Sequence, residues 1–314
     1  MTIEGVEMYR KEIVLRRHPD NPIISPLDFP DVDAVFNCGQ TMFEGKTLLL
    51  LSVCPRDGMP RLHVATSEDG VKFDIEPEPF ITQDDTPMPW RDMDTWPIDP
   101  RVTRIDDVYY IVRPIQGPAC ILQKTTDWKT HEFIECIALP CNRVASLFPE
   151  KINGLYYRVD RPFNIRTGSM WISSSPDLIN WGRHRPLAKA PFSSCWAVDK
   201  IGPTPPLRTP AGWLMIFHGV MTYAGGGRYS LGAMLMDIDD PSRIIGHSKG
   251  WILTPDAPYE FMGNCQNCVF SCGAIADVEK DLIRVYYGAA DTCIGLATGK
   301  LSELIELCLR DDKA

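Results

Sequence analysis

Apolar residues in this chain gather in short runs that alternate with polar turns. Five of these runs follow a polar turn and are rich in aromatic residues: 45–53, 106–114, 153–162, 211–220 and 280–291. Runs of this length that are bounded by Gly, Asp and Asn are typical of buried β-strands. They recur at intervals of roughly fifty to seventy residues, which indicates an internal repeat.

A second pattern follows each run: a strand, then Ser or Thr, then Asp, a turn and an aromatic residue. It occurs at 63–73, 121–133 and 170–181, and in weaker form at 231–241 and 294–304. Each repeat therefore predicts a sheet of about four strands, which is the size of a propeller blade. We expect an all-β chain that forms one five-bladed β-propeller domain over 1–314. A β-sandwich with accidental Asp turns is the alternative.

One segment has helical spacing. Residues 301–309 carry apolar side chains near positions i, i+3, i+4 and i+7. This predicts a short surface helix near the C-terminus. The 27 prolines among 314 residues argue against long helices elsewhere.

Composition narrows the function classes. Apolar residues make up 44% and charged residues 23% of the chain, as in folded water-soluble proteins. No run reaches the ~20 apolar residues of a membrane span, and the first twenty residues lack the apolar core of a signal peptide. We therefore expect a cytoplasmic protein with no membrane partner. The net charge of −9 and the lack of basic runs argue against a nucleic-acid partner.

The eleven cysteines are an odd number without a secretory signal, so we expect reduced thiols. Cys265 and Cys268 form a Cys-x-x-Cys pair, followed by Cys272. A structural zinc site needs four ligands, usually from two such pairs. The chain has no second pair, and we expect no metal.

Candidate chemistry lies at the ends of the aromatic-rich strands. In a propeller, one strand of each blade lines the central channel, and its end faces the cavity. Four of the five strands end in reactive side chains: Arg113, Asp160 with Arg161, His218 and Asp291. This arrangement is typical of an active site built on a repeat. The alternative is that these side chains form salt bridges between blades.

Asp99 lies between Pro97 and Pro100 in a loop that also contains Trp96 and Ile98. Pro100 predicts an extended backbone at Asp99. Desolvation among apolar neighbours raises the pKa of a carboxyl group and suits it to general acid catalysis. An Asx-type turn at Asp-Pro is the structural alternative.

Basic side chains occur on four different repeats at Arg143, Arg161, Lys200 and His218. Arg pairs with phosphate oxygens in a bidentate manner, and Lys adds a point charge. In an acidic chain, such groups need an anionic ligand or acidic neighbours.

Several motifs together resemble glycoside hydrolase family 130. They run in order from about residue 21 to 297: Asp99-Pro-Arg101, Leu139-Pro-Cys-Asn-Arg143, Leu147-Phe-Pro-Glu-Lys-Ile152, Asp160-Arg-Pro162, Trp196 with Lys200-Ile-Gly202, Gly212-Trp-Leu214, His218-Gly-Val220, Tyr229-Ser-Leu-Gly232 and Tyr286-Tyr-Gly-Ala-Ala-Asp291. The family is similar in fold to the repeat-based prediction. Its members are mostly inverting β-mannoside phosphorylases, with some β-mannosidases.

The resemblance implies roles for individual residues. Asp99 would be the general acid, with its proton passing through a mannosyl hydroxyl. Phosphate would be held by Arg143, Arg161, Lys200, His218 and Tyr229. The substrate would be held by Asn37, Arg101, Asp160 and Asp291, with Asn37 and Asp291 on the mannosyl ring.

Two departures from the family pattern bear on linkage and acceptor. Ile98 stands where many members have Glu, and Val53 or Cys54 stands where many have Arg. The first is similar to members that act on β-1,2-linked mannosides.

These features predict a glycosyltransferase-type phosphorylase that converts β-mannosides, preferably β-1,2-linked, and inorganic phosphate into α-mannose 1-phosphate and a shortened sugar. Phosphate arrives charged, so no carboxylate base is needed, and no cofactor is expected. The alternatives are a β-mannosidase, a phosphorylase of β-1,4 linkages and a non-enzymatic sugar-binding propeller. A homo-oligomer is compatible with the sequence.

Overall fold

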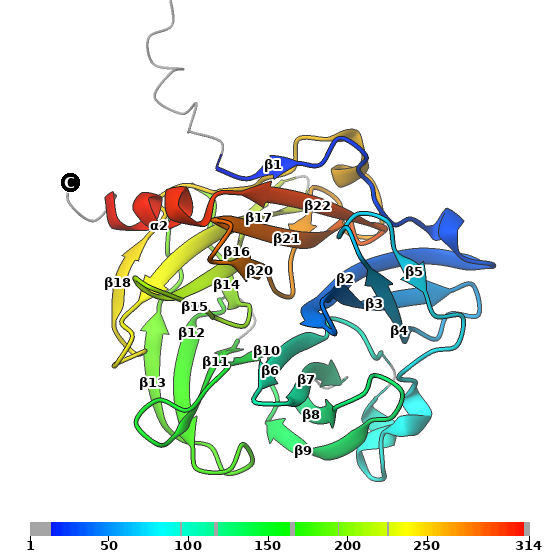
Figure 1. Cartoon of the computed structure of the whole chain (residues 1–314), viewed down its shortest axis with the longest axis horizontal. Helices are drawn as coiled ribbons and strands as arrows, with labels where there is room; N and C mark the ends of the chain where they lie inside the picture. Colours follow the sequence, from blue (N-terminus) through cyan, green and yellow to red (C-terminus); the bar gives the residue numbers. More distant parts are fainter. Residues whose placement is uncertain are drawn as a thin grey trace, which may run out of the picture.

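The computed structural model describes residues 14–94, 96–115, 119–163, 167–193, 195–224 and 226–310. Their strands form five antiparallel sheets around one centre, as Figure 1 shows. This confirms the five-bladed β-propeller and excludes the β-sandwich. The first thirteen residues, on which the expectation about targeting rests, lie outside the described part.

The first four blades run outwards from the centre in sequence order. Blade 1 contains β2 (Val32–Phe43), β3 (Lys46–Pro55), β4 (Arg61–Ser67) and β5 (Asp74–Ile75). Blade 2 contains β6 (Arg101–Ile105), β7 (Val108–Ile115), β8 (Ala119–Thr125) and β9 (Glu132–Ala138). Blade 3 contains β10 (Asn142–Leu147), β11 (Tyr156–Pro162), β12 (Met170–Ser175) and β13 (Gly182–Ala188). Blade 4 contains β14 (Lys200–Pro203), β16 (Gly212–Tyr223), β17 (Gly226–Met236) and β18 (Ile244–His247), with β15 (Leu207–Thr209) beside β16.

Blade 5 is assembled from both ends of the chain. It contains β19 (Val269–Phe270), β21 (Leu282–Ala289) and β22 (Cys293–Gly299), with β20 (Ile275–Asp277) beside β21. Its outermost strand is β1 (Arg16–Arg17), which pairs with β22 in antiparallel register. The N-terminal segment therefore closes the ring.

The five aromatic-rich runs are the second strands of their blades, β3, β7, β11, β16 and β21. The expectation that these strands line the centre is wrong, because the innermost strands are β2, β6, β10, β14 and β19. A second strand has a paired strand on each side and a neighbouring blade over each face. Its side chains are buried on both faces, which explains the nearly continuous apolar runs.

The recurring Ser/Thr-x-Asp pattern forms the turn after the third strand in blades 1 to 3. The carboxylates of Asp69, Asp127 and Asp177 each accept hydrogen bonds from backbone N–H groups two and three residues further on. These bonds lower the pKa of Asp69 to about 2. Asp237 makes the same turn in blade 4. Blade 5 has no such turn among its described residues, because β22 leads directly into a helix.

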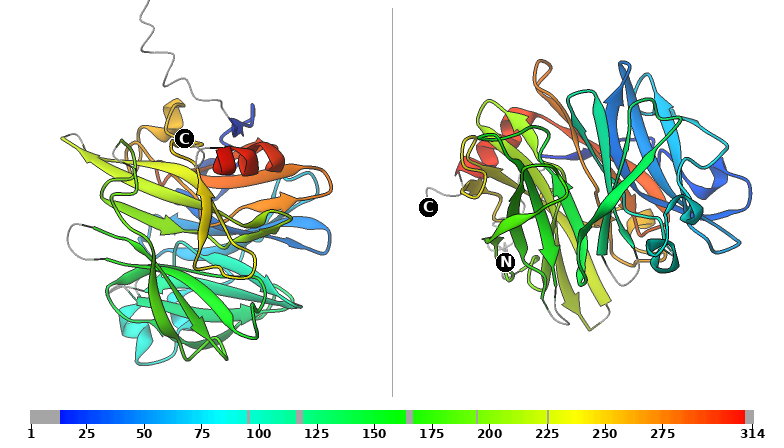
Figure 2. Two further views of the ribbon diagram at one scale, coloured as in Figure 1. Left: turned by 90° about the vertical axis from the view of Figure 1, so that its left-hand side faces the viewer. Right: turned by 90° about the horizontal axis from the view of Figure 1, so that it is seen from below.

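That helix, α2 (Leu301–Arg310), confirms the prediction for 301–309. It packs against β17 and β18 on the outside of the ring (Figure 1, Figure 2), with Leu301, Leu304 and Cys308 buried. Four short 3-10 turns complete the described structure: η1 (Pro26–Asp28), η2 (Gln83–Asp85), η3 (Trp90–Met93) and η4 (Pro258–Glu260). No helix in the described ranges is both long and apolar enough to cross a membrane.

Candidate active site

Asp99 lies just before β6, the innermost strand of blade 2, and is buried. Its backbone N–H donates to Ser52 Oγ at 3.0 Å, and its carbonyl accepts from the Arg101 guanidinium at 2.9 Å. Ser52 Oγ also donates to the carbonyl of Asn37 at 2.9 Å, so one hydroxyl positions both residues. Hydrogen bonds from blades 1 and 2 therefore hold the backbone of Asp99, which carries the carboxylate.

Three carboxamide or carboxylate residues of the site share an unusual backbone. Asn37, Asp99 and Asp291 have φ values of 41°, 53° and 49°, in the left-handed region. The expectation that Pro100 holds Asp99 extended is therefore wrong. The hydrogen bonds of Asp99 to Ser52 and Arg101 outweigh the local preference of a residue before proline. Backbone of this kind costs about 1–3 kcal/mol per residue and is found most often at functional sites.

Asn37 lies between the two carboxyl groups of the site. Its amide Nδ2 donates to Asp99 Oδ1 at 2.8 Å, and its hydrogen bonding lowers the pKa of Asp291. Burial and the nearby Asp99 carboxylate outweigh this effect and raise the pKa of Asp291 to about 7. Gly288 makes room for Asn37, since a Cβ at Gly288 would lie 2.1 Å from Asn37 Oδ1.

The basic residues converge beside this carboxyl pair. Arg143 Nη2 lies 3.7 Å from Asp99 Oδ2, and Arg161 Nη1 lies 3.2 Å from His218 Nε2. Lys200 Nζ lies 5.1 Å from the centre of the Tyr229 ring. Gly202 leaves space for the imidazole, because a Cβ there would lie 2.3 Å from His218. Residues from blades 3 and 4 therefore build one cationic site.

The cations of this site destabilise one another's charged forms. Burial, followed by the charges of Arg161 and Arg143, lowers the pKa of Lys200 to about 8. Burial lowers the pKa of Arg161 to about 10, with Arg101 and Arg143 contributing. Burial and three neighbouring cations hold the pKa of His218 well below its usual range. Such a cluster binds an anion favourably, because the anion relieves this repulsion.

Buried polar atoms without partners point to the same place. Among the described residues, five such atoms belong to the site: Asn37 Oδ1, Arg101 Nη2, Arg161 Nε, His218 Nδ1 and Asp291 Oδ1. Buried polar groups almost always have hydrogen-bond partners, so this concentration is typical of a site built for a polar ligand.

Asp160 departs from the set that the sequence predicts. Neighbouring residues of β11 point to opposite faces, so Arg161 faces the site while Asp160 faces blade 2. Its carboxylate pairs with Arg158 at 2.7 Å. Both residues line a separate cavity of about 440 Å³ together with Trp171, Trp181 and His184. The structure thus brings together nine of the ten predicted residues and places Asp160 apart from them.

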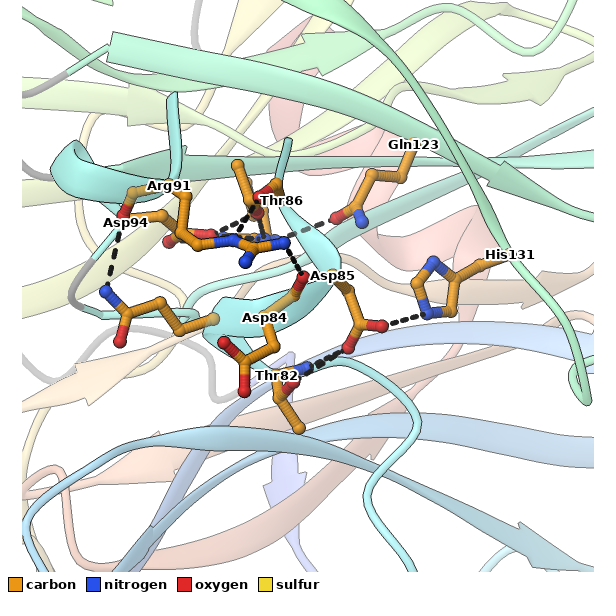
Figure 3. Close-up of polar contacts among 10 residues, drawn as sticks. Thr82, Asp84, Asp85, Thr86, Arg91, Asp94, Gln123 and His131 are labelled. Atoms are coloured by element: carbon orange, nitrogen blue, oxygen red, sulfur yellow. Dashed lines mark hydrogen bonds and ion pairs between the residues drawn. The ribbon is translucent and has the colours of Figure 1, made fainter. Parts of the chain in front are cut away.

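Arg113 lies in a salt-bridge network, as one of the sequence alternatives predicts. Its guanidinium forms two hydrogen bonds to Asp94 at 2.7 and 2.8 Å and contacts Thr86 and Gln123. Figure 3 labels these three partners. The side chains of Arg113 and Asp94 are fully buried. This network attaches the segment before Asp99 to β7.

Sequence reasoning missed two residues that shape the site. Ser52 supports Asp99 and Asn37, and its signal was a hydroxyl that interrupts the apolar run of β3. Phe270 in β19 lies under His218 with ring centres 4.5 Å apart, and 5.8 Å from the Arg101 guanidinium. The sequence pattern offered little indication of this role, because an aromatic residue in an apolar segment is most often part of the hydrophobic core.

The described residues contain no group of three or more His, Cys, Asp or Glu side chains placed to hold a metal ion. No disulfide joins any of the eleven cysteines, all of which lie in the described ranges. The chemistry available here is that of a carboxyl pair beside a cationic cluster.

The pH dependence of anion binding follows from Lys200. Its pKa of about 8 leaves the ammonium charged below that pH and neutral above it. We expect the dissociation constant for inorganic phosphate, used as a probe anion, to rise above pH 8, by at most about ten-fold per pH unit for one proton. Phosphate titrations from pH 6 to 10 measure this. In Lys200→Arg the loss should move to higher pH, because guanidinium keeps its charge. An unchanged profile in this variant would assign the titration elsewhere.

The fold and the site define a class of propeller proteins in which a buried carboxyl pair adjoins a binding site for an anion. The comparisons identify the class more closely. The model of glycoside hydrolase family 130, described as beta-1,4-mannooligosaccharide phosphorylase, matches residues 15–310. The chain therefore belongs to glycoside hydrolase family 130.

Characterised relatives cover almost the whole chain. Beta-1,4-mannooligosaccharide phosphorylase of Ruminococcus albus is 33% identical, covering 93% of this chain and 90% of its own. Beta-1,2-mannobiose phosphorylase of Thermoanaerobacter is 34% identical, covering 90% and 96%. The structure of beta-1,2-mannobiose phosphorylase from Listeria innocua, in complex with beta-1,2-mannobiose, has a TM-score of 0.84 at 30% identity and covers 94% and 99%.

Proposed function

We propose that this protein is an inverting β-mannoside phosphorylase that acts on β-1,2-linked manno-oligosaccharides. The single observation that carries the proposal is the convergence of Arg143, Arg161, Lys200 and His218 beside Asp99. A cationic cluster next to a sugar site suits a phosphate nucleophile. Relatives with β-1,2 and β-1,4 phosphorylase names support the reaction class.

In the proposed reaction, a phosphate oxygen attacks the anomeric carbon from the face opposite the glycosidic bond. The C1–O bond to the leaving sugar breaks, and a C1–O bond to phosphate forms with inversion. The leaving oxygen receives a proton from the protonated form of Asp99, through a mannosyl hydroxyl as the family resemblance implies. Phosphate needs no carboxylate base, whereas an inverting hydrolase uses a second carboxylate to activate water.

The cationic cluster does the positioning. Arg143, Arg161 and Lys200 hold the phosphate in line with the anomeric carbon, while Asn37 and Asp291 hold the mannosyl ring. Holding two reactants in a productive geometry is worth several kcal/mol of barrier reduction. We propose no cofactor beyond inorganic phosphate, and a cytoplasmic location for the protein.

A β-mannosidase is the second candidate, because Asp291 supplies a second buried carboxyl group with a raised pKa. Incubation of β-1,2- and β-1,4-mannobiose with and without inorganic phosphate separates the two functions. We expect α-mannose 1-phosphate only with phosphate, and faster turnover of the β-1,2 linkage. Release of free mannose at the same rate without phosphate would establish the hydrolase instead.

The phosphate site gives a quantitative prediction. Replacing Arg143, Arg161 or Lys200 by Ala removes charge-assisted hydrogen bonds worth about 1.5–3 kcal/mol each. The apparent affinity for phosphate should fall about ten- to a hundred-fold, with a much smaller effect on the uncharged mannoside. Synthesis from mannose 1-phosphate should show the same defect.

Initial rates against phosphate concentration measure this effect. Arg185→Ala is the matched control, because Arg185 is an exposed arginine of blade 3 on the outer strand β13. An equal loss in this control, or unchanged phosphate dependence in all three site variants, would contradict the assignment.

A further inference from the structure

The Cys-x-x-Cys pair that the reaction leaves unused lies beside the site. Gln266 and Asn267 form a turn between Cys265 and Cys268, and Asn267 has a left-handed φ of 52°. A β-turn brings its first and fourth Cα atoms within about 7 Å, close to the ~4.4–6.8 Å that a disulfide spans. Cys265 packs against the cluster that contains Cys268, and each thiol is close enough to shift the pKa of the other.

The two thiols have unequal chemistry. Cys265 is half-buried, whereas Cys268 is buried. The neighbouring Cys268 thiol lowers the pKa of Cys265, and Lys200 adds to the effect. The Cys265 thiol and burial raise the pKa of Cys268. An accessible sulfur that ionises more readily, beside a buried sulfur that keeps its proton, is the arrangement of an attacking and a resolving cysteine.

This turn is attached to two residues of the site. Cys265 N–H donates to the carbonyl of Ala290 at 3.0 Å, and Ala290 N–H donates to the carbonyl of Cys268 at 3.0 Å. Ala290 immediately precedes Asp291. Tyr229 N–H donates to the carbonyl of Asn267 at 3.0 Å, and Tyr229 and Cys265 both pack against the cluster of Cys268, Phe270 and Cys272. A displacement of the turn would therefore shift Asp291 of the carboxyl pair and Tyr229 beside the cationic cluster.

We propose that Cys265 and Cys268 are a reversible oxidation site for low-molecular-weight disulfides, and that the disulfide they form impairs the adjacent active site. The Cys265 thiolate attacks a sulfur of the oxidant, which breaks the S–S bond of the oxidant and releases one thiolate. Cys268 then attacks Cys265 in the mixed disulfide and releases the second thiolate. The proton of Cys268 passes to that leaving thiolate. Two electrons thus move from the cysteine pair to the oxidant.

The effect on activity follows from the geometry. An S–S bond of about 2.05 Å is much shorter than a non-bonded contact between two sulfur atoms, so the turn contracts when the bond forms. Misplacement of site residues by about 1 Å can cost 10²-fold in rate. We expect kcat/KM for phosphorolysis to fall about ten- to a hundred-fold on oxidation and to recover on reduction. This readout rests on the proposed function, whereas formation of the disulfide does not.

The experiment uses the full chain with the exposed Cys141 and Cys195 replaced by Ser, because exposed thiols would react with any oxidant. The protein is equilibrated with glutathione and glutathione disulfide at set ratios, alkylated and analysed by peptide mass. We expect the 265–268 peptide to lose two hydrogens. Cys268→Ser should instead retain a glutathione adduct on Cys265, and Cys265→Ser should form neither product.

Phosphorolysis is then measured for each variant before and after oxidation, so that every variant is its own reference. Only the protein with both thiols should show a loss that dithiothreitol reverses together with the disulfide. Full alkylation of both thiols at every ratio of glutathione to glutathione disulfide would show that Cys265 and Cys268 are not an oxidation site. A disulfide that leaves the rate unchanged would overturn its link to the active site. An absence of phosphorolysis in the reduced protein would refute the proposed function, while the mass result would still decide the thiol chemistry.

Discussion

Asp99→Asn is expected to fold normally and to lose about 10²–10⁴-fold in turnover of an unactivated β-mannoside. The Asn side chain has the same shape, and its oxygen can still accept from Asn37. It has no acidic proton for the leaving oxygen. Initial rates with mannobiose and phosphate measure the loss.

An aryl mannoside with a good leaving group tests the reason for the loss, because such a group leaves without protonation. It should be cleaved by Asp99→Asn at a rate much closer to that of the wild type. Asp291→Asn is the matched control, since it changes the neighbouring carboxyl group and should lose activity on both substrates. Near wild-type turnover of mannobiose by Asp99→Asn would remove Asp99 from the role of acid.

Arg113→Met is expected to destabilise the protein by about 3–5 kcal/mol, because it leaves the Asp94 carboxylate buried without a counter-charge. The free energy of unfolding from urea titration measures this. The double variant Arg113→Met/Asp94→Leu should recover much of the stability, since a buried ion pair can be replaced by apolar side chains at little cost.

Arg104→Met is the matched control for that experiment. Arg104 pairs with Asp107 at 3.1 Å on the surface, where ion pairs contribute about 0–1 kcal/mol. A loss at Arg113 no larger than the loss at Arg104 would show that the buried network does not stabilise the attachment of the segment before Asp99 to β7.

The fold was predictable because each repeat carries its own signals. The second strand of a blade is buried on both faces and therefore reads as an apolar run. The Asp69, Asp127 and Asp177 turns use side-chain oxygens for local backbone bonds, so the same residue types recur. The position of a strand within its sheet was not predictable in this way. It depends on pairing between segments, and apolar runs assigned to the centre proved to be second strands.

The site was predictable only where a motif carried it. Arg161 and Asp160 are adjacent in sequence, yet one faces the cationic cluster and the other pairs with Arg158. Which of them faces the site depends on the register of β11, which the sequence pattern leaves open. The left-handed backbone conformation of Asp99 was likewise not predictable from the sequence. It depends on a hydrogen bond from Asp99 to Ser52, which belongs to another blade.

The pairing of β1 with β22 has a consequence for how the protein assembles. Arg16 and Arg17 lie opposite Thr298 and Ala297, so the contact joins segments almost a full chain length apart. Contacts of such high sequence separation form late and slow folding. During synthesis, blades 1 to 4 can form from neighbouring segments, whereas blade 5 is complete only when β1, which is synthesised first, pairs with β22, which is synthesised last. Until β1 pairs, the edge of β22 exposes backbone N–H and C=O groups that can pair with other chains. The pairing of β1 therefore protects this edge from aggregation as well as closing the ring.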